Sequence, residues 1–292
     1  MIFTVFTSFK KQSLTYLVKL LPTQLLGGIQ RALPSNSFIN NLMRLSVSDR
    51  DVKIVRGIGA GLKFNGGSAN PDFALGDYEL PLQEALASHL KPGGVFYDIG
   101  ANIGFFSILG AKLVGHTGKV YAFEPVPDNA AKIHHNARLN NFSQITVIEK
   151  AVSGSMGEGQ LLLTRNIGGH TLASVDRPPD VQGSMAVALV SIDELIAREE
   201  LTPPTLVKID VEGAELDVLQ GMKQTLAQYQ PLVIYEIDAK QEASFERKQQ
   251  AVADFLQSQS YQIQPIENCY PGITWKVGHA IAFPLKTVKS NP

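Results

Sequence analysis

The sequence predicts an α/β protein whose parallel sheet is covered by helices on both faces. Short apolar runs typical of buried strands alternate with helical segments of about 10–15 residues, which is the pattern of such a sheet. With 44% hydrophobic and 18% charged residues, the chain has the composition of an ordinary globular protein. The expected strands are VFYDIG, KVYAFEP, ITVIEKAV, TLVKID, PLVIYEI, YQIQPI and HAIAFP.

A lead-in segment, residues 51–94, precedes this alternation. Its first part, residues 51–75, is glycine-rich with short alternating runs, which predicts a small hairpin. A helical stripe that includes Leu82 and Leu86 follows, and Pro92-Gly93-Gly94 ends it. The expected main domain therefore runs over residues 51–292.

The helices between the expected strands have ordinary boundary signals. FFSILGAKLV ends at Gly115, and DNAAKIHHNARLNN begins at Asp128. Further helices are expected from about Ala214 to Ala227 and over FERKQQAVADFLQ. The segment 153–190 departs from the alternation, because strand-like QLLLT and MAVALV are joined by a link rich in Gly, Pro and Asp. An inserted hairpin near one end of the sheet is the simplest interpretation.

The start of the chain differs in charge from the rest. Residues 1–48 contain five basic residues and no Asp or Glu, and apolar residues recur at helical spacing from Leu14 to Leu21. No apolar run reaches the ~18 residues that span a bilayer, and no secretion signal is recognised. We expect residues 1–50 to form a basic amphipathic helical extension packed on the main domain. Peripheral contact with a membrane surface is the alternative.

Net charge and cysteine content limit the classes of function. A net charge of −1 gives no case for nucleic-acid binding, which usually requires a basic excess. The single cysteine, Cys269, excludes an internal disulfide and multi-cysteine zinc clusters. These features fit a reducing compartment, so we expect a cytoplasmic protein.

A glycine-spaced turn follows the strand VFYDIG and is the first candidate binding site. Its pattern is D-x-G-x-N-x-G, formed by Asp98, Gly100, Asn102 and Gly104. Dinucleotide-binding loops have the spacing G-x-G-x-x-G, and an acid at the strand end would repel their pyrophosphate. The turn therefore disfavours an NAD-dependent oxidoreductase. An aspartate there suits a ligand with a cationic amine, such as the methionine end of S-adenosylmethionine.

A second acid lies at the end of the next expected strand. Glu124 ends KVYAFE, and a carboxylate at this position can accept hydrogen bonds from both hydroxyls of a ribose. NAD and S-adenosylmethionine share that requirement, so Glu124 alone does not discriminate between them. Helix capping is the structural alternative for both acids. An acid, a glycine turn and a second acid within one βαβ unit are a more specific signal than any one of them.

With these motifs the chain resembles the FkbM-type S-adenosylmethionine-dependent methyltransferases. The resemblance covers about residues 76–237 and includes GDYELP, VFYDIGANIGFFSILGA, GKVYAFEPVPDN, NARLNN, VSIDEL, VKIDVEGAELDVLQG and VIYEI. It implies a doubly wound, Rossmann-like sheet of seven strands and transfer of a methyl group to a hydroxyl of a sugar, glycan or polyketide-like molecule. The GDYELP block adds Tyr78 and Glu79 to the expected cofactor contacts. The segment 153–190 lies outside the resemblance, and we expect it to influence acceptor choice.

Methylation of a hydroxyl requires a general base or a Lewis-acid metal. Asp210 follows the strand TLVKI at the sheet edge that carries Asp98 and Glu124, and it is either the base or an oxygen ligand of Mg²⁺. Glu236, at the end of VIYEI, is a second candidate for either role. His170, in the glycine-rich insertion, is a candidate base because histidine titrates near neutrality. Helix capping by Asp210 and an ordinary loop histidine are the structural alternatives.

Two rival interpretations accept the predicted fold but differ in the acceptor or in catalytic activity. The acceptor could be an amine or a macromolecule, although enzymes that N-methylate planar amides or bases often carry NPPY or DPPY where this chain has DVEG. The chain could also be a non-catalytic, membrane-attached module that retains only the fold. The intact set of predicted site residues argues against the second.

Overall fold

The computed structural model describes residues 37–67, 70–164, 169–174, 180–239, 241–270 and 276–285. Its main sheet has seven strands in the order β12-β13-β11-β10-β3-β4-β5. Their bounds are β3 Val95–Ile99, β4 Lys119–Phe123, β5 Ile145–Ile148, β10 Leu206–Ile209, β11 Leu232–Ala239, β12 Tyr261–Ile266 and β13 Lys276–Pro284. Only β13 runs against the other six. The predicted α/β class with a mostly parallel, seven-stranded sheet is confirmed.

The strand order reverses between β3 and β10. From β3 the chain adds β4 and β5 on one side, then returns to place β10 on the other side of β3. Such a reversal opens a crevice at the carboxyl ends of the two strands, where ligands bind in open α/β sheets. Every residue of β3 and β10 is buried, as expected for central strands covered on both faces.

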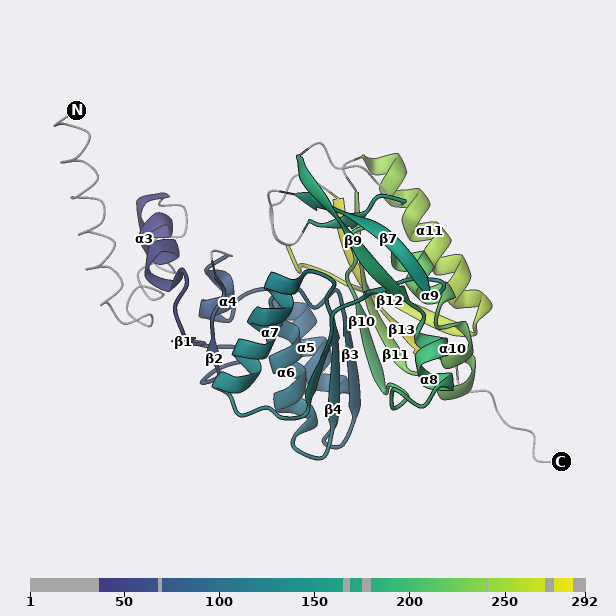
Figure 1. The fold of residues 1–292 in the computed structure, drawn as a ribbon, viewed down its shortest axis with the longest axis horizontal. Coiled ribbons are helices and arrows are strands. Elements are labelled where there is room, and N and C mark those ends of the chain that lie inside the picture. The colour runs from purple at the N-terminus through teal and green to yellow at the C-terminus, as the bar shows by residue number, and fades with distance from the viewer. Residues whose placement is uncertain are drawn as a thin grey trace.

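Helices cover both faces of this sheet (Figure 1). One layer consists of α5 (Leu80–His89), α6 (Phe105–Val114) and α7 (Pro127–Leu139). The other contains α8 (Ile192–Ala197), α9 (Glu215–Gln220), α10 (Lys223–Tyr229) and α11 (Glu242–Ser258). Alternate residues of β3 face the two layers, because Phe96 packs with the α5–α6 core and Tyr97 with the α9–α11 core.

The predicted insertion forms a second, smaller sheet. Its strands are β6 (Ala151–Val152), β7 (Gly157–Thr164), β8 (Thr171–Leu172) and β9 (Val181–Val190), in the order β6-β9-β7-β8. The long strands β7 and β9 pair antiparallel and lie side by side in Figure 1. The sheet has four strands where the sequence pattern indicates two. β8 is too short to give a recognisable period, and β6, the end of the expected strand ITVIEKAV, pairs with β9 instead of continuing β5.

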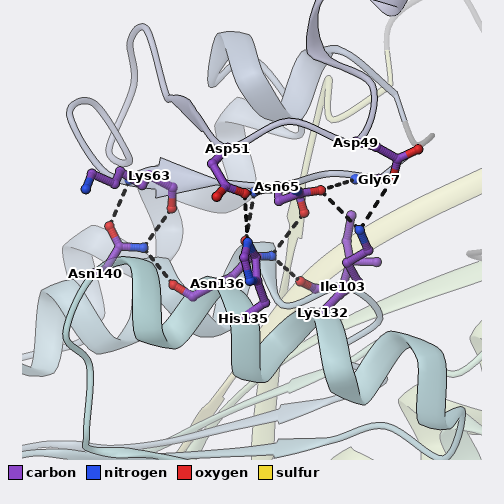
Figure 2. A network of polar contacts seen from close by, with 10 residues as sticks. All are labelled: Asp49, Asp51, Lys63, Asn65, Gly67, Ile103, Lys132, His135, Asn136 and Asn140. Carbon is purple, nitrogen blue, oxygen red and sulfur yellow. Dashed lines mark hydrogen bonds and ion pairs between the residues drawn. The ribbon is translucent and has the colours of Figure 1, made fainter.

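The described part of the predicted extension contains α3 (Ser37–Val47). The lead-in contains β1 (Val52–Lys53), β2 (Lys63–Phe64) and α4 (Asp72–Leu75), and it docks on α7 (Figure 2). Asn136 of α7 is buried, and its side-chain oxygen accepts a hydrogen bond from the Asn65 backbone amide at 2.7 Å. Its side-chain nitrogen donates to the Ile103 carbonyl at 3.0 Å. One side chain thus joins the lead-in to the turn after β3. Residues 1–36 of the predicted helical extension lie outside the described residues. No helix within the described ranges has the length and apolarity needed to cross a membrane.

Candidate active site

A cavity of about 860 Å³ opens at the carboxyl ends of the main-sheet strands. Its wall includes residues from the ends of β3, β4, β10 and β11, from the turn before α5 and from the insertion. Eight of the ten predicted site residues line it, namely Tyr78, Glu79, Gly100, Asn102, Glu124, His170, Asp210 and Glu236. Asp98 and Gly104 are the two that do not. The topology thus brings acids from four separate segments to one cavity.

The turn after β3 has three residues in the left-handed backbone region, with φ of 77° at Gly100, 50° at Asn102 and 83° at Gly104. Gly100 is required by a close approach, because a Cβ there would lie 1.7 Å from the carbonyl oxygen of Asp210. The two loops that follow β3 and β10 are therefore in direct backbone contact. Asn102 has a left-handed φ without being glycine, and such strain is commonly found at functional sites.

Glu124 lies in the wall beside this turn. One carboxylate oxygen accepts the Asn102 amide at 2.9 Å, and the other accepts the Val126 amide at 2.9 Å and the Asn129 side-chain amide at 3.3 Å. Burial raises the pKa of Glu124 to about 7, although these donors act against the rise. The carboxylate is therefore fixed in orientation and changes charge near neutral pH.

Asp98 lies beneath the cavity wall and is fully buried. Ser107 donates to one carboxylate oxygen at 2.6 Å, and the Lys208 ammonium lies 3.7 Å from the other. Burial raises the pKa of Asp98, and Lys208 opposes that rise. Direct contact between Asp98 and a cofactor amine thus stays a prediction, because the charge that faces this carboxylate is a lysine of the chain itself.

Lys208 is the residue that the sequence reasoning missed. It is the third residue of the all-buried strand β10, with 3% of its side chain exposed, and its ammonium lies 3.0 Å from Asp210 Oδ2 and 5.1 Å from the centre of the Phe106 ring. Burial disfavours the charge, but Asp210 and Asp98 outweigh it and raise the pKa of Lys208. A lysine inside the apolar run LVKI was the available signal, because a buried lysine requires acidic partners.

A second polar cluster consists of Glu79, Glu236 and His279. His279 Nε2 lies 2.6 Å from Glu236 Oε2 and 3.6 Å from Glu79 Oε2. The Tyr270 hydroxyl donates to the other oxygen of Glu79 and lies 2.9 Å from the Tyr78 hydroxyl. Tyr78 and Glu79, which the sequence joins only through one short motif, are therefore part of a network that reaches β11 and β13.

His170 lies in the cavity wall beside β8. Its Nδ1 accepts the Thr164 backbone amide at 3.1 Å, and burial lowers the pKa of the ring. A neutral imidazole that accepts at Nδ1 carries its hydrogen at Nε2. His170 is thus arranged in this structure as a hydrogen-bond donor, and a role as base requires the other tautomer.

Glu212, two residues after Asp210, also lines the cavity. It has a φ of 53° in the turn after β10. Burial, together with Asp238, Asp210 and Glu236, raises the pKa of Glu212 to about 10. This end of the cavity is thus rich in carboxyl groups, which favour positively charged groups in a ligand.

Comparisons with known proteins agree with this architecture. A family described as the Methyltransferase FkbM domain matches residues 98–263, more than half of the chain. The hexuronic acid methyltransferase AglP of Haloferax volcanii is 34% identical over 53% of this chain and 60% of its own length. The 31-O-demethyl-FK506 methyltransferase FkbM of Streptomyces tacrolimicus is 29% identical over 46% of this chain and 61% of its own. The matches thus span about three fifths of these two curated relatives.

A solved structure described as methyltransferase FkbM, from Methylobacillus flagellatus, also matches. It has a TM-score of 0.45 and 18% identity, over 68% of this chain and 50% of that chain.

Proposed function

Because the chain belongs to the FkbM methyltransferase domain family, we propose that it transfers a methyl group from S-adenosylmethionine to a hydroxyl of a sugar, glycan or polyketide-like molecule. The observation that carries this proposal is the single cavity whose wall combines the glycine turn and Glu124 with Asp210 and Glu236. A cofactor and an acceptor would lie side by side in it.

The turn and Glu124 fit the nucleoside part of the cofactor. Gly100 lies in the cavity wall, and Glu124 is held by its donors with its carboxylate in the same wall. The buried Oδ1 of Asn102 has no hydrogen-bond partner in the described structure, so it is available to a ligand donor. In this proposal Glu124 accepts from the ribose hydroxyls. When bound, S-adenosylmethionine supplies an electrophilic methyl group on a positively charged sulfur, which the surrounding carboxyl groups favour.

Asp210 is the proposed base. It lines the cavity with 25% of its side chain exposed, and Lys208 holds one of its oxygens at 3.0 Å. That contact leaves the other oxygen to take the proton of an acceptor hydroxyl, as O-methylation requires. The same ammonium would repel a divalent cation, so the structure favours Asp210 as a base over Asp210 as a Mg²⁺ ligand. His170, with its hydrogen at Nε2, suits orientation of the acceptor.

The named relatives support the acceptor class. One is described as acting on hexuronic acid and the other on 31-O-demethyl-FK506. Both descriptions fit a hydroxylated small molecule or glycan better than an amine acceptor. The insertion supplies His170 and Leu161 to the wall, so acceptor choice is expected to depend on it.

Calorimetry followed by an activity assay tests the proposal. The full chain should bind S-adenosylhomocysteine and should not bind NAD. It should then transfer labelled methyl groups from S-adenosylmethionine to members of a panel of free and glycan-linked sugars and macrolides. Binding of NAD in place of S-adenosylhomocysteine would refute the cofactor assignment, and transfer to amines alone would refute the acceptor class.

A further inference from the structure

Three metal-ligating side chains from three segments of the chain meet at the edge of the cavity. Glu79 comes from the turn before α5, Glu236 from β11, and His279 from the facing position on β13. One ligand atom of each lies within 4.8 Å of the other two. Glu79 and Glu236 also line the cavity, so a ligand at this point would be reachable from it.

The three facing atoms are buried and contact one another. The exposed fraction of the side chain is 0% for Glu79, 12% for Glu236 and 3% for His279. His279 Nε2 forms ion pairs with Glu236 Oε2 and Glu79 Oε2, and the three atoms have no hydrogen bond to any other group of the described structure. Two buried carboxylate oxygens that converge on one imidazole nitrogen are a donor set to which one shared cation can bind.

Neighbouring side chains hold Glu79 and His279 in place, as the outer partners of metal ligands do. Tyr270 donates to Glu79 Oε1, which leaves Oε2 to point toward His279. The Tyr270 ring also packs against the His279 ring, with 5.5 Å between the ring centres. Glu79 has a φ of 47°, a strained backbone conformation for a residue other than glycine. Carboxylates and histidines that bind a metal are typically held by outer partners of this kind.

We propose that Glu79, Glu236 and His279 bind one divalent transition-metal ion at the edge of the cavity. Two carboxylate oxygens and one imidazole nitrogen suit Mn²⁺, Fe²⁺ or Zn²⁺, whereas Mg²⁺ prefers oxygen ligands alone. Three protein ligands leave positions open toward the cavity. Binding itself is independent of the reaction, but the ion's role rests on the proposed function: an acceptor hydroxyl at an open position would lose its proton to Asp210 more readily.

Metal titration of the full chain tests this site without reference to activity. After dialysis against a chelator, the protein should bind one Mn²⁺ per chain in calorimetry, with loss of the free Mn²⁺ signal in electron paramagnetic resonance. Zn²⁺ should compete for the same site. Loss of outer partners alone typically costs 10–100-fold in metal affinity, so Glu236→Gln and His279→Gln should each weaken Mn²⁺ binding by about 100-fold or more.

His135→Gln is the matched control. His135 also lies against a carboxylate, with Nε2 2.7 Å from Asp51 Oδ1, but the pair is exposed on α7 and does not line the cavity. This variant should bind Mn²⁺ as the unaltered chain does. If His279→Gln fails to fold, as judged by circular dichroism, the near-isosteric Glu236→Gln decides alone.

Two results would overturn the proposal. One is the absence of saturable binding of Mn²⁺ and Zn²⁺ at millimolar concentrations, which would make the group a proton-bridged ion triad. The other is equal Mn²⁺ affinity in Glu236→Gln and the unaltered chain, which would place the ion elsewhere. Binding of S-adenosylhomocysteine, measured in the same samples, separates failure of this site from failure of the proposed function.

Discussion

Lys208 and Asp98 occupy paired positions on adjacent parallel strands, and the Lys208 ammonium reaches past Asp98 to Asp210 at the cavity wall. The buried carboxylate of Asp98 and the carboxylate of Asp210 in the cavity wall thus share one buried ammonium group. This arrangement connects the turn that carries the predicted cofactor contacts to the proposed base. It also makes Lys208 the residue whose loss should have the widest effect.

The first prediction is that Lys208→Met destabilises the fold. It removes the cation and leaves Asp98 fully buried with an uncompensated charge, which typically costs about 3–5 kcal/mol. Urea denaturation should show that loss in the free energy of unfolding. The double variant Lys208→Met with Asp98→Asn should recover part of it, because the buried charge is gone. A double variant no more stable than Lys208→Met would show that the pair is not coupled.

The second prediction concerns the proposed base. Asp210→Asn keeps the shape of the side chain and removes its ability to take a proton. The rate of methyl transfer should fall by about 10²–10⁴, the usual contribution of general acid–base assistance. Calorimetry should find the affinity for S-adenosylhomocysteine nearly unchanged. An Asp210→Asn variant with an unaltered rate would exclude Asp210 as the base and redirect attention to Glu236 and His170.

The third prediction is a pH dependence of cofactor binding through Glu124. Its pKa is raised to about 7, so the carboxylate that accepts from a ribose forms only as the pH rises through neutrality. Affinity for S-adenosylhomocysteine should increase between about pH 6 and pH 8, and Glu124→Gln should flatten that increase. Glu124→Ala should weaken binding roughly 10- to 150-fold, the loss expected for a charge-assisted contact. An identical pH profile in Glu124→Gln would contradict the assignment.

The same group has the opposite effect on the stability of the ligand-free protein. A carboxyl whose folded pKa lies above its ordinary 4.5 favours folding while protonated. That stabilisation is present below the unfolded pKa and is lost as the pH rises through about 7. Between about pH 5 and pH 8 the free energy of unfolding should therefore fall less in Glu124→Gln than in the unaltered chain.

The fourth prediction is that Asn136→Ala costs more stability than Asn140→Ala. Both asparagines lie at the end of α7 and hold the lead-in. Asn136 is buried and also donates to the Ile103 carbonyl, whereas Asn140 is half-buried and donates to the Lys63 carbonyl (Figure 2). Leaving buried partners unsatisfied costs about 1–3 kcal/mol. Thermal unfolding of the two variants measures the difference, and equal melting temperatures would argue that the Ile103 contact is dispensable.

The sequence predicts most of the fold because the main-sheet strands and their helices are local patterns. The acids after β3, β4 and β10 were found for the same reason, since carboxyl ends of parallel strands meet at one edge. Lys208 was missed because a single charge in an apolar run does not show which partners it has. His279 was missed because its position opposite Glu236 depends on β13 lying antiparallel beside β11, a register that no local pattern specifies.

The insertion packs on the main domain through a small hydrophobic cluster and supplies part of the cavity wall. Leu161, Leu172 and Val187 pack there with Ala214, and the Thr171 hydroxyl donates to the Glu212 carbonyl at 2.7 Å. The turn after β3 and Glu124, by contrast, belong to the main domain. A sheet that lies outside the main sheet can be reshaped while the turn after β3 and Glu124 are retained. Relatives could therefore acquire new acceptors by divergence of this one module, and grafting residues 153–190 between family members is a route to engineered specificity.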